Sequence, residues 1–388
     1  MAQQIRFGWT KSMAESSIQI PVSQPHISED DKKAVLDCLN NGFLSGDAPI
    51  VAEFERNFAS IVGTKYGIAV ANGSVALDLA LHALNLEQGD EVIVPSFTIA
   101  SCLFAIMRTG ATPVFVDCDE DTWNMSIQTV EQKITTKTKA ILVVHIYGLP
   151  VDIDPIASLC QQKNISLVED SAEAHGIKYK GAYCGSFGDM STFSFYANKA
   201  ITTGEGGMVL TDDENLYEKV RYFRNLAFAP PPGKRFIHEE MGWNYRLGSM
   251  QAALGNSQIN RLEKIVSEKR QIGLKYNELL SANPLITLQP SETSYSHNVY
   301  WVVGVLLDPR FNTEEIAREL KKRGVDTRPF FYPLHKQPLL RKFGLQEQKS
   351  LPIAEKLGKQ GIYLPSFIGL DDSKIEFVSQ QLLDSIEV

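Results

Sequence analysis

The chain has 388 residues, of which 44% are hydrophobic, and it carries a formal net charge of −8. A chain of this length can bury a large core and is expected to divide into two or three domains. The acidic balance argues against a general nucleic-acid surface. It leaves room for an anionic substrate, because helix N-termini and local cations bind phosphate within acidic proteins.

Cysteine spacing and apolar patterning narrow the class of protein further. The cysteines are odd in number, widely spaced and form no CxxC pair; they are Cys38, Cys102, Cys118, Cys160 and Cys184. This pattern predicts reduced thiols in a cytoplasmic protein, with neither a disulfide framework nor a metal site. No apolar run reaches about 18 residues, so no membrane span is expected. The polar N-terminus shows no apolar signal core.

From residue 50 onward, strand-like and helix-like segments alternate along the chain. The expected strands are 91–95, 112–117, 140–145 and 165–170, and the expected helices are 75–84, 101–110, 127–134 and 154–163. Val/Ile-rich strands that alternate with helices predict an α/β fold, in which a mostly parallel sheet is covered by helices.

After about residue 265 the pattern changes to that of a smaller α+β unit. A long charged helix (261–280) precedes a strand (297–307) and a further helix (313–324). The expected organisation is a flexible N-terminal extension at 1–18, a large α/β domain at 19–260 and a small α+β domain at 261–388. The proline-rich stretch 229–233 is expected to form an exposed loop.

Lys199 stands in the most informative stretch of the chain, residues 191–209. A strand-like run of alternating polar and apolar residues precedes it, and a glycine-rich turn (204–207) and a second strand follow it. An amine at a tight junction between strands can be desolvated and fixed in direction, and these conditions let a lysine form a Schiff base. The alternative is a surface lysine that precedes a hairpin.

Two other segments are expected at the same edge of the sheet, because ligands bind outside the carboxyl ends of the strands. Gly73 and Ser74 precede an expected helix and could cradle a phosphate, or could belong to an ordinary helix N-cap. Asp170 ends a strand, where a buried carboxylate needs a cationic partner, although an N-cap is again the alternative. Together with Ser194 and Lys199 these residues fit pyridoxal 5′-phosphate, with its phosphate at the small residues, its pyridine nitrogen at Asp170 and its aldehyde at Lys199.

Four longer segments resemble one protein family. They are VEDSAEAHG (168–176), GSFGDMSTFSFYANKAITTGEGGMV (185–209), GWNYRLGSMQAALG (242–255) and TRPFFYPLHKQP (327–338). They look like the DegT-type sugar-nucleotide aminotransferases, and the similarity runs in order from about residue 18 to the C-terminus. The resemblance implies a type I aminotransferase fold and a homodimer with its two active sites at the subunit interface.

The resemblance also assigns roles to residues of this chain. By position, Lys199 matches the Schiff-base lysine, Asp170 the partner of the pyridinium nitrogen, and Gly73, Ser74 and Ser194 the phosphate ligands. Glu173 matches a position near the phenolic oxygen of the cofactor. Asn244 matches an asparagine that reaches the cofactor phosphate of the neighbouring subunit, although on sequence alone it reads as a turn residue.

One position departs from the family pattern. After the segment PSFT the family usually has an aromatic residue that stacks on the pyridine ring, whereas this chain has Ile99. An aliphatic side chain can still cover the ring by dispersion. Phe97, two residues earlier and on the same face if the strand continues, is an alternative cover.

The activity implied by the resemblance is transfer of an amino group from L-glutamate to the C4 ketone of a nucleotide-linked 4-keto-6-deoxy hexose. Such a sugar belongs to surface polysaccharide or glycoconjugate biosynthesis, and its nucleotide is left open among GDP, UDP and dTDP. Lys199 would move a proton as general base and acid while Asp170 keeps the pyridine nitrogen protonated. Ser45, Arg246 and His335 are candidates to contact the sugar substrate, and a surface or core role is the alternative for each.

Three other functions compete with this one. A related dehydratase on the same fold carries histidine where this chain has Lys199, so the lysine disfavours it. A cofactor-binding regulatory or scaffold protein would not require a titratable lysine beside Asp170 and Ser194. A dinucleotide-binding oxidoreductase is compatible with the strand–helix alternation, but no GxGxxG segment follows the first strand.

Overall fold

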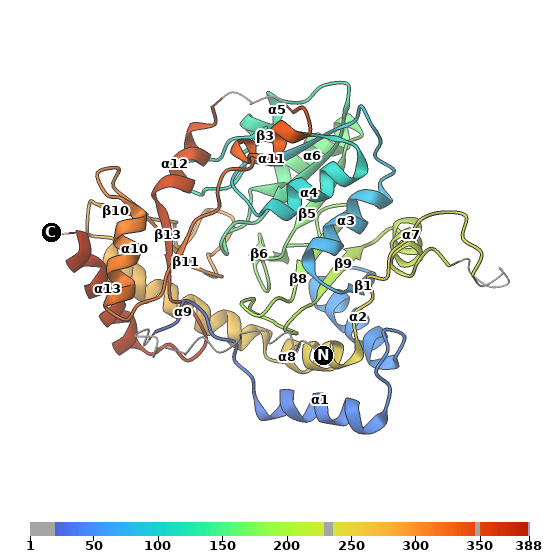
Figure 1. Ribbon diagram of the computed structural model, residues 1–388, viewed down its shortest axis with the longest axis horizontal. Coiled ribbons are helices and arrows are strands. Elements are labelled where there is room, and N and C mark those ends of the chain that lie inside the picture. Colours follow the sequence, from blue (N-terminus) through green and yellow to red (C-terminus); the bar gives the residue numbers. More distant parts are fainter. Residues whose placement is uncertain (1–19, 229–235, 346–349, 387–388) are drawn as a thin grey trace, which may run out of the picture.

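A computed structural model describes residues 20–228, 236–345 and 350–386 of the chain (Figure 1). The extension expected at residues 1–18 and the proline-rich stretch 229–233 therefore lie outside the described residues. Among the described residues, no helix combines the length and apolar character that a membrane crossing requires.

A seven-stranded sheet with the order β1-β9-β8-β5-β4-β2-β3 forms the centre of the molecule. Its strands are β1 (Tyr66–Val70), β2 (Glu91–Pro95), β3 (Thr112–Val116), β4 (Thr138–Val144), β5 (Ser166–Asp170), β8 (Met190–Ser194) and β9 (Gly207–Thr211). The pairs β2–β3, β2–β4, β4–β5 and β5–β8 are parallel, whereas β9 runs antiparallel to both of its neighbours. The α/β fold with a mostly parallel sheet is thus confirmed, and the expected strands lie within a few residues of their predicted bounds.

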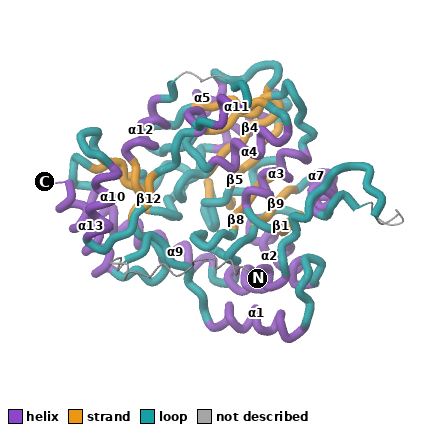
Figure 2. The backbone as a smooth tube through the Cα atoms, viewed as in Figure 1, coloured by secondary structure: helices purple, strands orange, loops and turns teal. Residues whose placement is uncertain are grey.

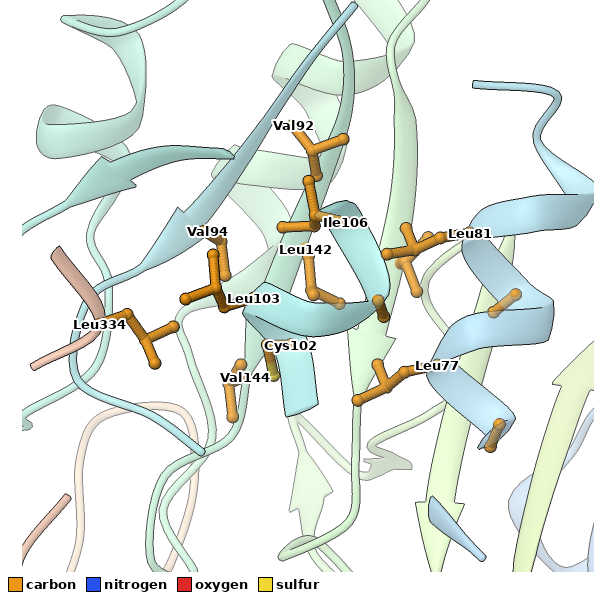
Figure 3. Close-up of a cluster of buried hydrophobic side chains, with 14 of the residues drawn as sticks. Leu77, Leu81, Val92, Val94, Cys102, Leu103, Ile106, Leu142, Val144 and Leu334 are labelled. Atoms are coloured by element: carbon orange, nitrogen blue, oxygen red, sulfur yellow. The ribbon is translucent and has the colours of Figure 1, made fainter. Parts of the chain in front are cut away.

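Helices cover both faces of this sheet, so that the strands lie in the interior (Figure 2). The covering helices are α2 (Pro49–Val62), α3 (Gly73–Ala83), α4 (Ala100–Thr109), α5 (Ile127–Glu131), α6 (Ile153–Lys163), α7 (Glu214–Arg224) and α8 (Ser249–Ile259). Figure 3 shows one such contact, in which Leu103 of α4 lies beside Val94 of β2, while Leu81 of α3 lies on the opposite side of α4. Burial of these apolar side chains holds the first turns of α3 and α4 at the carboxyl ends of the strands.

The N-terminal helix α1 (Glu29–Asn41) lies along α8, at the bottom of the view in Figure 1. Ser28 caps it, because its hydroxyl accepts a hydrogen bond from the backbone N–H of Asp31. The buried carboxylate of Asp31 in turn accepts hydrogen bonds from Arg261 and Ser257, on the α8–α9 side of the contact. Polar groups therefore fix the register of α1 on the rest of the chain.

The C-terminal part of the chain forms a separate sheet with its own core. Its antiparallel order is β10-β11-β13-β12, built from β10 (Ile286–Leu288), β11 (Val303–Leu307), β12 (Arg328–Pro329) and β13 (Gly361–Leu364). The long helix α9 (Leu262–Leu280), α10 (Thr313–Lys322) and α13 (Asp372–Ile386) contribute the apolar side chains that fill this core. The boundary expected near residue 260 stays a prediction.

One expected element differs from the structure. The strand predicted at 297–307 begins only at Val303, because Tyr300 has a positive φ of 53° and interrupts the extended backbone. The preceding residues instead pack against the β4 end: Val299 donates its N–H to the carbonyl of Gly148. Trp301 consequently lies outside the strand and packs within the core of the large domain.

The two sheets are also joined through a helix cap. Asp117, directly after β3, accepts hydrogen bonds from the backbone N–H groups of Ile353 and Ala354 in the first turn of α12 (Pro352–Gln360). A carboxylate at this position satisfies free N–H groups and complements the helix dipole. The C-terminal part is therefore attached firmly to the edge of the large sheet.

Candidate active site

A cavity of 730 Å³ opens where the parallel strands of the central sheet end. Seven of the residues singled out from the sequence line it: Gly73, Ser74, Ile99, Asp170, Glu173, Ser194 and Lys199. They come from the ends of β5 and β8, the turns that follow these strands, and the starts of α3 and α4, which explains how positions far apart in the chain meet at one place.

Lys199 lies in the turn after β8, where its backbone N–H donates to the carbonyl of Tyr196. Its side chain is 9% exposed, and its Nζ is 4.0 Å from Glu173 Oε1. Burial lowers the pKa of this amine below its usual value, while the carboxylates of Glu173 and Asp170 act in the opposite direction. A lysine with a lowered pKa supplies more of the neutral, nucleophilic amine near neutral pH.

Asp170 is the last residue of β5 and is buried. Its Oδ1 accepts a hydrogen bond of 3.0 Å from the backbone N–H of Ala172, and its Oδ2 accepts one of 3.2 Å from the thiol of Cys102 on α4. Burial raises the pKa of this carboxyl group, against those hydrogen bonds and the nearby charge of Lys199. A buried acceptor held in this way suits a cationic N–H donor.

Glu173 is buried three residues after Asp170 and faces Lys199. The backbone N–H of Tyr147 donates to its Oε2 at 2.8 Å, which leaves Oε1 directed at the lysine. Burial raises the pKa of this carboxyl group to about 7. Near neutral pH it therefore exchanges a proton easily and can either donate or accept a hydrogen bond.

Gly73 and Ser74 form the first turn of α3, and the N-cap of this helix is Asn72, whose side chain accepts from the N–H of Val75. Asn72 is therefore the residue that caps the helix, whereas Gly73 and Ser74 line the cavity. A Cβ on Gly73 would lie 2.7 Å from the Cβ of Ser194, so the two segments approach closely only because residue 73 is glycine. N–H groups of a first helical turn beside two hydroxyls suit a phosphate.

Ile99, and not Phe97, borders the cavity. Ile99 is the N-cap of α4 and is 43% exposed. The ring of Phe97 is buried and packs against Tyr147, Phe330 and Phe331. The alternation that would place both residues on one face ends with β2 at Pro95, so Phe97 turns into the core.

Four further candidates do not line this cavity among the described residues of the single chain. Ser45 accepts a hydrogen bond from Asp47, and Arg246 donates to Asn225. Asn244 pairs with Asn225 through an isolated β-bridge.

His335 is buried, with its Nδ1 2.6 Å from Ser96 Oγ and its Nε2 3.1 Å from Glu355 Oε1, so both ring nitrogens are engaged within the chain.

Three further residues that shape the site were not identified from the sequence. The thiol of Cys102 donates a hydrogen bond to Asp170, and the backbone N–H of Tyr147 donates one to Glu173. The ring of Trp301 lies against the amine of Lys199. The one signal available for Cys102 was its place in a predicted helix that begins at the ligand edge. Trp301 was assigned to a strand, and its contact depends on the irregular backbone before β11.

Taken as chemistry, the groups around the cavity fit pyridoxal phosphate: a buried amine for the aldehyde, a buried carboxylate for the pyridine nitrogen and a small-residue cradle for the phosphate. No group of three or more His, Cys, Asp or Glu residues in the described part of the chain is arranged to hold a metal ion. The fold and the site therefore define the class of pyridoxal phosphate enzymes.

Comparison with known proteins gives the family. Residues 25–383 match the DegT/DnrJ/EryC1/StrS aminotransferase family, and the chain belongs to it. A GDP-perosamine synthase of Escherichia coli O157:H7 is 42% identical over 363 residues, which are 94% of this chain and 97% of that protein. The aminotransferase TlmJ from Streptoalloteichus hindustanus has a TM-score of 0.88 at 31% identity, covering 95% of this chain and 99% of its own. Spr1654 from Streptococcus pneumoniae, solved in its PLP form, has a TM-score of 0.88 at 27% identity, covering 95% and 98%.

The protein is accordingly a pyridoxal phosphate-dependent aminotransferase. This result confirms the family, fold and cofactor expected from the sequence. It disfavours the dehydratase, scaffold and oxidoreductase alternatives.

Proposed function

We propose that the protein moves the amino group of L-glutamate to the C4 ketone of a GDP-linked 4-keto-6-deoxy hexose. The observation that carries this proposal is the 42% identity to a GDP-perosamine synthase over nearly the full length of both chains. The cavity supports it, since the buried lysine and carboxylate needed for amino transfer lie together. A UDP- or dTDP-linked keto sugar is the second candidate.

The residues around the cavity have separate roles in the proposed reaction. Lys199, Asp170, Glu173 and the cradle at Gly73, Ser74 and Ser194 would hold the cofactor, and Ile99 would cover one face of its ring. When bound, the cofactor supplies an electron sink and carries the amino group between the two substrates. The chain's own residues carry out the proton transfers at the donor and at the sugar.

Lys199 is the general base and acid of this scheme. Its neutral amine, favoured by burial, takes the proton from the α-carbon of the amino donor. The same amine later gives a proton to C4 of the sugar. Asp170 keeps a hydrogen-bonded proton on the pyridine nitrogen, because a buried carboxylate is costly without a cationic N–H beside it.

The complete site is proposed to need a second copy of the chain. Asn244 and Arg246 lie outside the single-chain cavity, on a segment bridged to Asn225 and to Val70, and would reach the neighbouring subunit's site. Ser45 is the corresponding candidate on the segment after α1. The protein would act as a cytoplasmic homodimer in the biosynthesis of a surface polysaccharide such as an O-antigen.

The test is a panel of GDP-, UDP- and dTDP-linked 4-keto-6-deoxy sugars, each incubated with L-glutamate and the purified protein. Mass spectrometry should detect the amino sugar from the GDP substrate first, together with 2-oxoglutarate. Lys199→Ala should abolish turnover. Product from the Lys199→Ala protein would contradict the assigned base, and product from only a UDP or dTDP sugar would overturn the GDP assignment.

A further inference from the structure

Trp301 contacts two consecutive residues of the lysine segment with one side chain. Its ring centroid is 3.7 Å from Lys199 Nζ, and its Nε1 donates a 3.0 Å hydrogen bond to the carbonyl of Asn198. It is 9% exposed and lines the same cavity. A single indole therefore contacts both the amine of Lys199 and the backbone next to it.

The backbone around Trp301 holds the ring in place independently of any ligand. A Cβ on Gly148 would lie 2.5 Å from the backbone nitrogens of Tyr300 and Trp301, so the chain passes over this glycine in close contact. The ring also packs at a centroid distance of 6.1 Å against Tyr147. Close packing of this kind leaves the indole little freedom to swing away from the lysine.

The indole face distinguishes the two protonation states of the amine. A ring face attracts an ammonium group through its quadrupole, more strongly when both groups are desolvated, and gives a neutral amine no comparable attraction. Of the titratable groups facing Lys199, Glu173 and Asp170 favour the charged amine, whereas buried His175 has a pKa near 3 and stays neutral. Trp301 adds an uncharged contact to this set.

We propose that Trp301 is a positioning residue, whose indole face holds the protonated amine of Lys199 while that amine is not bonded to the cofactor. Its N–H keeps the carbonyl of Asn198, and with it the lysine backbone, in register. The attraction is lost once the amine gives up its proton, so the ring retains the lysine between taking a proton and returning it. The role in turnover rests on the proposed function, whereas the contact itself does not.

The test measures the titration of the Lys199 amine in the full chain loaded with pyridoxamine 5′-phosphate, in which the lysine is free. Competitive acetylation with acetic anhydride across a pH series, read by peptide mass spectrometry, reports the midpoint for this one amine. Trp301→Met replaces the ring by an apolar chain, so the midpoint should fall by about half to one and a half pH units. Phe331→Met is the matched control, because Phe331 lines the cavity but packs on Tyr147 and Phe97.

Incorporation of 5-fluorotryptophan provides a second perturbation that hardly changes the volume of the side chain. Fluorine weakens the quadrupole, so the midpoint should fall by less than in Trp301→Met but in the same direction. A midpoint that is unchanged in both proteins, or that shifts equally in Phe331→Met, would overturn the proposal. The labelling is repeated without cofactor, and no labelling experiment contains a sugar substrate. Failure of the proposed transamination would therefore appear only in the substrate panel described above.

Discussion

Replacing Lys269 by methionine should change how the stability of the protein depends on pH. Lys269 lies on α9 and is 5% exposed. Its Nζ donates to the carbonyl and the hydroxyl of Ser366, at 2.8 and 2.5 Å, and neither acceptor carries a charge. Burial lowers the pKa of this amine from 10.5 to about 7.

The sign of the effect follows from this lowered pKa. Between pH 7 and 10.5 the unfolded chain holds a proton on Lys269 that the folded chain has released, so stability rises with pH in this window. The shift of 10.5 − 7 = 3.5 pH units corresponds to about 5 kcal/mol over the whole window. From pH 7 to pH 9 the wild type should gain about 2 kcal/mol relative to Lys269→Met.

Urea unfolding of the holoenzyme at both pH values, followed by tryptophan fluorescence, measures this difference. Lys264→Met is the control, because Lys264 is on the same helix with its side chain 77% exposed, paired with Glu268 in solvent. The control should show nearly the same change in unfolding free energy at both pH values, since surface ion pairs contribute little. A difference between wild type and Lys269→Met that stays constant from pH 7 to pH 9 would refute the reasoning.

Three further predictions concern the cavity. Gly73→Ala should weaken cofactor binding about 5- to 100-fold, because the added Cβ would lie 2.7 Å from Ser194 Cβ; equilibrium dialysis against the cofactor measures it, and unchanged affinity would contradict the close approach. The wild type should lose stability as the pH rises from 4.5 to 7, because the folded chain keeps a proton on Glu173 that the unfolded chain releases, and Glu173→Gln should not show this loss. Thermal unfolding across pH shows whether the stabilities of wild type and Glu173→Gln converge below pH 4.5. Cys102→Ala should lower cofactor affinity about 2- to 10-fold through the lost thiol donor to Asp170, while Cys102→Ser should stay near wild type; equal losses in both variants would point to packing instead.

The residues at the ends of strands were predictable because their position depends on local pattern and on a general rule of topology. Asp170 ends an apolar strand, and Lys199 follows a strand before a glycine-rich turn, so both had to lie at the ligand edge of a parallel sheet. Gly73 was predictable for the same reason, as a small residue at the start of a helix after β1.

Side chains outside that rule were not predictable. His335 is engaged by Ser96 from a distant part of the chain, and nothing in its own segment signals that contact. Phe97 follows the end of its strand, where two-residue alternation no longer decides which way a side chain points. Trp301 depends on the positive φ of Tyr300, a backbone state that is uncommon for a tyrosine and that no local motif announces.

The position of β9 in the sheet has a consequence for synthesis of the protein on the ribosome. β1 lies at the edge of the sheet and pairs with β9, so residues 66–70 have no partner among the described strands until residues 207–211 have emerged. Contacts between segments so far apart form late, and an unpaired strand edge is prone to wrong association in the meantime. The cavity residues up to Lys199 therefore emerge before the strand that pairs with β1, and Trp301 emerges later still.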